Sequence, residues 1–113
     1  GYAALYQNRL TPAIAAQLLP ERAMLAMVWR YLAAAPEMTQ ESPICLCRKI
    51  VRWTGKSMSL GQLMTCLDIF RDVGLMEITR HHKHLTIRLT PGDSKADLNT
   101  SQTMIRLRRA KEG

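Results

Sequence analysis

The chain has 113 residues, 47% of them hydrophobic, which favours one packed domain over a disordered chain or several domains. Sixteen Lys and Arg against nine Asp and Glu give a formal net charge of +7, which favours polyanions such as nucleic acids as partners. Three cysteines argue against a disulfide framework, and no apolar run approaches the roughly 18 residues of a membrane span. We therefore expect a cytoplasmic domain without membrane contact.

Prolines mark the helix boundaries in the first third of the chain. One or two short helices are expected before residue 20, with Thr11 as an N-cap ahead of a first-turn proline, Pro12. The stretch PERAMLAMVWRYLAAA predicts a longer helix over 20–35, and Pro36 ends it. Because the chain begins GYAALYQ without Met, we expect it to be a domain excised from a larger protein.

Two further helices are predicted in the middle of the chain. A serine–proline start and a terminal Gly55 delimit a helix over 42–54. A helix over 59–73 begins with a capping box, in which Ser59 and Gln62 satisfy each other's backbone amides. Gly74 ends this helix.

Apolar residues at helical spacing predict which side of each helix faces the core. They are Met24, Leu25, Val28, Leu32 and Ala35 in the first long helix; Ile44, Cys47, Ile50 and Val51 in the second; and Leu60, Leu63, Met64, Leu67, Phe70 and Val73 in the third. The face of the third helix expected to be exposed carries Gln62, Thr65, Asp68, Arg71 and Asp72.

After the third helix the apolar period changes to two, which is typical of strands. Met76 and Ile78, then Leu85, Ile87 and Leu89, flank the polar stretch RHHKH, so we predict a β-hairpin over 75–90. A last helix is expected over about 98–110, capped by an Asn, Thr or Ser.

Three helices followed by a hairpin is the element order of a winged helix. We therefore predict an α+β, mostly helical fold, in which a three-helix core carries a β-hairpin wing and short helical extensions lie at both ends. All 113 residues are assigned to this single domain.

Two stretches resemble a known family. SLGQLMTCLDIFRDVGLMEI, followed by KADLNTSQTMIRL, resembles the C-terminal domain of the RecJ-type single-stranded-DNA-specific exonucleases of the Firmicutes type, and PERAMLAMVWRYL resembles that domain's first helix. The matching positions are Leu67, Ile69, Phe70, Gly74, Leu75, Lys95, Leu98 and Ser101. Asp72 departs from the pattern, since the family usually has Glu there.

This resemblance implies a parent enzyme that cuts single-stranded DNA from its 5′ end with divalent metal, using Asp-His-His motifs in a separate catalytic core. Those motifs are absent from this chain. The resemblance therefore implies an accessory domain that contacts single-stranded DNA, the parent catalytic core, or a replication or repair protein.

No catalytic residue, metal site or cofactor is expected within the chain itself. The turn histidines His81, His82 and His84 and the three cysteines lack the Cys-x2-Cys or His-x3-His spacing of zinc sites. Cys47 and Cys66 fall on or near apolar stripes, where thiols are inert. The carboxylates are scattered rather than clustered.

Basic residues gather in two clusters that are candidates for nucleic-acid contact. The candidate residues are Arg48, Lys49, Arg52, Trp53 and Lys56 in the second helix and after it, and Arg80, His82, Lys83 and Arg88 in the hairpin. Trp53 either stacks on an unpaired base or covers the core. Arg106, Arg108, Arg109 and Lys111 add a third basic cluster in the tail.

Two alternative functions remain open. One is a protein-interaction winged helix without DNA contact, for which Met24, Met27, Met58 and Met104 would offer a compliant surface unless they fill the core. The other is a DNA-binding transcriptional regulator, which is disfavoured because the exposed face of the third helix carries two carboxylates beside one Arg.

Overall fold

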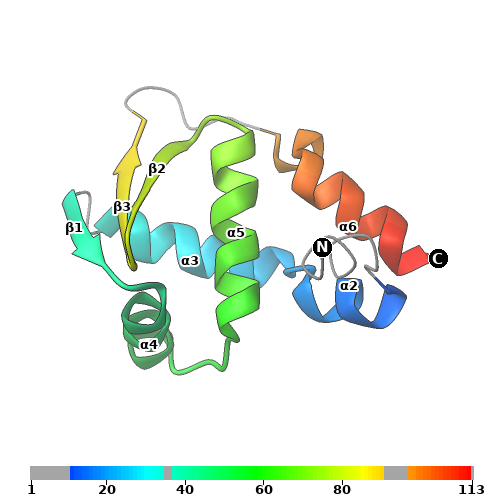
Figure 1. Ribbon diagram of the computed structural model, residues 1–113. Coiled ribbons are helices and arrows are strands. Elements are labelled where there is room, and N and C mark those ends of the chain that lie inside the picture. Colours follow the sequence, from blue (N-terminus) through cyan, green and yellow to red (C-terminus); the bar gives the residue numbers. More distant parts are fainter. Residues whose placement is uncertain (1–10, 35–36, 91–96, 113) are drawn as a thin grey trace.

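The computed structural model describes residues 11–34, 37–90 and 97–112, and these form a mostly helical α+β structure (Figure 1). In chain order the elements are α2 (Pro12–Leu18), α3 (Arg22–Ala34), β1 (Glu37–Glu41), α4 (Pro43–Thr54), α5 (Leu60–Asp72), β2 (Met76–His81), β3 (His84–Leu89), the 3-10 turn η1 (Leu98–Thr100) and α6 (Gln102–Glu112). The three long helices predicted from the sequence are α3, α4 and α5, each one to three residues shorter than expected. Three predicted features fall outside the described residues. They are a helix before residue 11, the core position Ala35, and Lys95 in the stretch that resembles the family.

The hairpin belongs to a three-stranded antiparallel sheet with the order β1-β3-β2. In the hairpin, Ile78 pairs with Ile87 and His81 with His84. Strand β1 was not predicted, because its sequence EMTQE contains a single apolar residue and no alternation. It joins the sheet through its backbone, with Met38 in register with Ile87.

Helix starts follow the predicted capping chemistry. The Ser59 hydroxyl oxygen accepts a hydrogen bond from the Gln62 amide at 3.1 Å, and the Gln62 side chain accepts one from the Ser59 amide at 3.0 Å. Ser42 caps α4 in the same way, accepting from the Cys45 amide. Gly55 ends α4 at φ 74°, a left-handed conformation that glycine adopts without strain.

The capping box at the start of α5 gives a first testable prediction. Ser59→Ala removes the acceptor for the Gln62 amide, so the free energy of unfolding should fall by about 1 kcal/mol. Urea unfolding followed by circular dichroism measures this change. Ser57→Ala, at an exposed position two residues earlier, is the control and should leave the unfolding midpoint unchanged. Equal stability of the two variants would contradict the assigned cap.

Helix α5 lies at the centre of the molecule, in contact with α2, α3, α4, α6 and β2 (Figure 1). It therefore buries residues on most of its circumference, and Leu63, Cys66, Leu67 and Ile69 are fully inaccessible. The predicted one-sided stripe was too narrow for a helix with this many neighbours, although Arg71 and Asp72 remain exposed. Thr65, expected to be exposed, is buried, and its hydroxyl donates to the Gly61 carbonyl at 2.8 Å.

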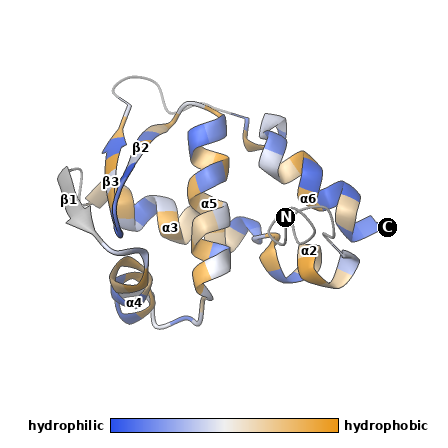
Figure 2. Cartoon of the chain, in the orientation of Figure 1, coloured by the Kyte–Doolittle hydropathy of each residue, from blue (hydrophilic) through white to orange (hydrophobic). Residues whose placement is uncertain are grey.

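The predicted tail helix is divided in two by Ser101. The residue is fully buried, and its hydroxyl oxygen accepts from the Met104 amide as the N-cap of α6. The Ser101 hydroxyl in turn donates to Asp72 at 2.7 Å, and the Thr103 amide donates to the same carboxylate oxygen at 3.0 Å. The last residue of α5 thus holds the first turn of α6. Beyond that turn α6 is largely hydrophilic (Figure 2).

Candidate nucleic-acid interface

The exposed side of α4 carries the first predicted basic cluster. We define the basic face of α4 by its six exposed residues, which are Ile44, Cys45, Arg48, Lys49, Arg52 and Trp53. The opposite side of the helix packs into the core through Leu46, Cys47 and Ile50. At 100° per residue, the six exposed positions span about half of the helix circumference, with Ile44 at one edge and Trp53 at the other. The cations lie between these edges.

Trp53 is a surface residue rather than a cover for the core. Its side chain is 55% exposed, the highest value among the large hydrophobic residues that the structure describes. The ring of Tyr31, on α3, contacts it edge-on, with centroids 5.5 Å apart and planes at 66°. The indole is therefore held by one neighbour while much of its surface faces solvent.

The hairpin turn consists of His82 and Lys83, with His82 at φ 56°. Both turn residues are exposed, as are Arg80, His81 and His84 beside them. The rings of His81 and His82 lie 4.5 Å apart in an edge-on arrangement. We refer to residues 80–84 as the hairpin tip.

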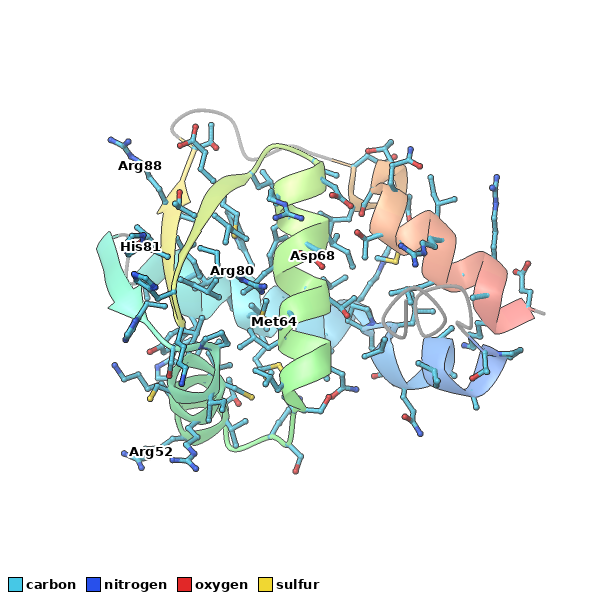
Figure 3. All side chains as sticks on the ribbon, viewed as in Figure 1. Arg52, Met64, Asp68, Arg80, His81 and Arg88 are labelled. Atoms are coloured by element: carbon cyan, nitrogen blue, oxygen red, sulfur yellow. The ribbon has the colours of Figure 1, made fainter. Side chains whose placement is uncertain are left out.

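Arg80 differs from the other residues of the tip because it is on the core-facing side of β2. It pairs across the hairpin with Leu85, as Ile78 pairs with Ile87. Its side chain lies between β2 and α5 (Figure 3). Burial raises the pKa of Asp68 on α5, while the cations Arg71 and Arg80 act to lower it. The carboxylate of Asp68 therefore offsets part of the positive charge of Arg80, and we expect Arg80 to be a weaker phosphate contact than its exposure suggests.

A hollow of about 380 Å³ joins the hairpin tip to the start of α4, and we call it the tip groove. Its apolar lining includes Ile44, Leu60 and Leu85, and its cationic lining includes Arg80 and Lys83. His82 also lines it. The groove makes the tip and the basic face of α4 one continuous surface.

Two of the groove residues were predicted from helical spacing to face the core. Ile44 is 54% exposed and Leu60 40% exposed, although both fit the apolar stripes of their helices. Each lies in the first turn of its helix and lines the tip groove instead of the closed core. Helical spacing shows the side of a helix and not how far along it the core extends, so no sequence signal distinguishes these two residues.

The remaining candidate residues lie away from the tip groove. Arg88 is at the far end of the hairpin from the tip (Figure 3), in register with Glu77 on β2 and with Glu37 on β1. The opposed charge of Glu77 on the adjacent strand offsets that of Arg88, so the structure does not extend the cationic surface to Arg88. Lys56 is exposed in the loop after α4, close in sequence to Trp53.

The basic residues of α6 form a separate surface. Arg106, Arg108, Arg109 and Lys111 are all exposed, and α6 packs on α2 and α5 at the opposite end of the molecule from the sheet (Figure 1). Two surfaces with the same type of charge are thus separated by the helical body.

The structure also locates the thiols and the methionines. Burial raises the pKa of Cys66 to about 12 and raises that of Cys47, so both are protonated thiols at neutral pH. Met27, Met58 and Met104 are buried, and they fill the core rather than form a docking surface. Among the described residues, no group of three His, Cys, Asp or Glu side chains is gathered closely enough to hold a metal ion.

None of the helices within residues 11–34, 37–90 and 97–112 combines the length and apolarity needed to cross a bilayer. A scan of protein-family models and searches of curated proteins and of solved structures found no match to this chain.

Proposed function

We propose that this chain is a non-catalytic winged-helix module that binds single-stranded DNA as the accessory C-terminal domain of a RecJ-type exonuclease. The element order supports the winged-helix assignment, since α3, α4 and α5 precede the hairpin of β2 and β3. The family assignment rests on the sequence resemblance. By that resemblance the parent catalytic core, and not this domain, holds the divalent metal.

One observation supports single-stranded DNA above other polyanions. The basic face of α4 combines the exposed cations Arg48 and Arg52 with the exposed ring of Trp53. Single-strand binding proteins combine cations that contact the backbone with aromatic rings on which unpaired bases stack. A duplex buries its base faces internally and would leave the indole without a partner.

The arrangement of α5 argues against sequence readout in the manner of a transcriptional regulator. A recognition helix inserts an exposed face into the major groove. The accessible side of helix α5 instead carries Asp68 beside Arg71, and its terminal Asp72 is bound to α6. DNA is therefore contacted mainly through the basic face of α4 and the hairpin tip.

A binding titration tests this function. The affinity for a short labelled single strand should exceed that for the matched duplex, and log K should fall linearly with log salt, by about 0.7 per neutralised phosphate. Arg80→Glu with Lys83→Glu should weaken binding about tenfold, because it replaces two cations of the hairpin tip with anions. We expect no larger loss, because Asp68 already offsets part of the charge of Arg80. Fluorescence anisotropy measures each value. Undetectable binding at low salt would overturn the proposal.

The second candidate is a protein-docking module, and one feature favours it. Leu25, Ala26, Trp29, Phe70, Leu75 and Leu98 line an apolar hollow of about 350 Å³ between α3 and the end of α5. Trp29 is only half-buried there, against Phe70 at a centroid distance of 5.5 Å. Exposed apolar hollows are typical of protein contacts. Absence of DNA binding in the titration above would favour this function.

A further inference from the structure

We propose that the tip groove is a subsite for one unpaired base, and that Trp53 is a second base subsite at the other edge of the basic face of α4. This inference rests on the proposed single-strand binding and adds to it which parts of the strand are recognised. It states that bases contribute to affinity in addition to the phosphates.

The lining of the groove selects the chemistry of its occupant. Ile44 and Leu60 are two of the four large hydrophobic side chains that the described part of the chain exposes. They lie in the same hollow as Arg80 and Lys83. An occupant must therefore offer a flat or apolar group together with negative charge. A nucleotide has both, since its base covers the apolar side chains while its phosphate meets the cations.

The two subsites are separated by a distance that a short strand spans. Trp53 lies nine positions after Ile44, which is about 13.5 Å along the axis of α4 at a rise of 1.5 Å per residue. Since the two residues lie on opposite edges of a helix about 10 Å wide, the diagonal between them is about 17 Å. At a rise of about 3.4 Å per nucleotide, that is about five steps of a stacked strand.

The cations occupy the positions that such a path requires. Arg48 and Arg52 lie four and eight residues after Ile44, on the exposed face between the two subsites. A strand crossing this face diagonally thus meets an apolar groove, then the cations of the helix, then an aromatic ring. This alternation distinguishes the basic face of α4 from α6, whose sequence QTMIRLRRAKE exposes Arg106, Arg108 and Arg109 and contains no aromatic residue.

The test compares a thymidine oligonucleotide with an abasic strand of the same length and the same number of phosphates. We expect the abasic strand to bind at least tenfold more weakly, while the salt dependence of the two affinities stays the same. Thymidine strands shorter than about five nucleotides should lose a comparable factor, because they reach one subsite only. Equal affinities of the thymidine and abasic strands would overturn the base subsites and leave the proposed function standing. Binding of neither strand would overturn the proposed function itself.

Variants locate the subsites. Ile44→Ala with Leu60→Ala should weaken binding of the thymidine strand about fivefold and leave binding of the abasic strand unchanged, and Trp53→Ala should do the same with a larger factor. Ile14→Ala is the matched control, because Ile14 is similarly exposed (43%) but lies on α2, away from the groove. Circular dichroism checks that each variant is folded. An equal effect of Ile14→Ala, or an equal loss for both strands, would overturn the assignment.

Discussion

Replacing Arg48 and Arg52 with Glu should weaken binding of single-stranded DNA on the order of a hundredfold at about 0.1 M salt. Both residues are exposed in the middle of the basic face of α4, so every strand that joins the tip groove to Trp53 passes them. The change removes two attractive contacts and adds two repulsive ones. For the neutral pair Arg48→Gln with Arg52→Gln, the salt slope should fall by about 1.4, at 0.7 per phosphate. Anisotropy titrations at several salt concentrations measure both quantities.

The matched control changes the same charges at the other end of the molecule. Arg106→Glu with Arg109→Glu alters two exposed arginines of α6 and so gives the same net charge as the α4 variant. We expect a loss of less than tenfold, because exposed charges beyond a Debye length of about 10 Å are largely screened at 0.1 M salt. Equal losses for the two pairs would mean that net charge alone, and not the basic face of α4, determines the affinity.

Local chemistry was predictable from the sequence because it depends on residues close in the chain. The N-caps Thr11, Ser42 and Ser59 all accept the expected backbone hydrogen bonds. Gly55 ends α4 in the left-handed conformation that its sequence position indicates. Strand alternation also placed Leu85 and Ile87 in the core, where the structure has them.

Features set by distant residues were not predictable. Strand β1 depends on backbone pairing with β3, which leaves no apolar pattern in EMTQE. The burial of Thr65 follows from the number of elements around α5. The exposure of Ile44 and Leu60 depends on how the distant hairpin lies beside the first turns of α4 and α5, where the tip groove is left open.

Counting charges along the sequence identified cations of α4 and of the hairpin tip that the structure exposes. It did not show which charged residues pair with partners distant in the sequence. Asp72 was placed on an exposed helix face as a group that would repel phosphates. In the structure its carboxylate is bound to the first turn of α6. Arg88 was grouped with the cations of the tip, and the sheet register sets it opposite Glu77 instead. Which charges are available to a ligand depends on these long-range pairings.

Asp72→Ala should lower the free energy of unfolding by about 2 kcal/mol, the largest effect we expect for an exposed residue of this domain. The carboxylate accepts from the Ser101 hydroxyl at 2.7 Å and from the Thr103 amide at 3.0 Å. Without it, Ser101 is fully buried with its hydroxyl donor unsatisfied. The negative charge also stabilises the positive N-terminal end of α6. Chemical denaturation at neutral pH measures the loss.

Asp68→Ala is the control on the same helix. Asp68 forms an ion pair with the exposed Arg71 three residues later, with Nη2 of Arg71 3.3 Å from Oδ1 of Asp68, and such exposed pairs contribute less than about 1 kcal/mol. Burial raises the pKa of Asp68, so removing its charge costs little. A loss of stability for Asp68→Ala equal to that for Asp72→Ala would contradict the role assigned to the contact with α6.

The effect of Asp72 should also depend on pH. Burial alone would raise its pKa, but hydrogen bonds from Thr103 and Ser101, together with the charge of Arg71, lower the pKa below its ordinary value of 3.8. A carboxyl group whose pKa is lower in the folded state contributes stability that is fully present above its unfolded pKa and is lost as the pH falls through the folded pKa. The difference in stability between the wild type and Asp72→Ala should therefore be constant near neutrality and shrink below about pH 4. Affinity for single-stranded DNA at neutral pH should be unchanged in the folded variant, because the contact between α5 and α6 is separate from the basic face of α4. A constant stability difference down to pH 2 would show that the carboxylate charge does not contribute to the contact.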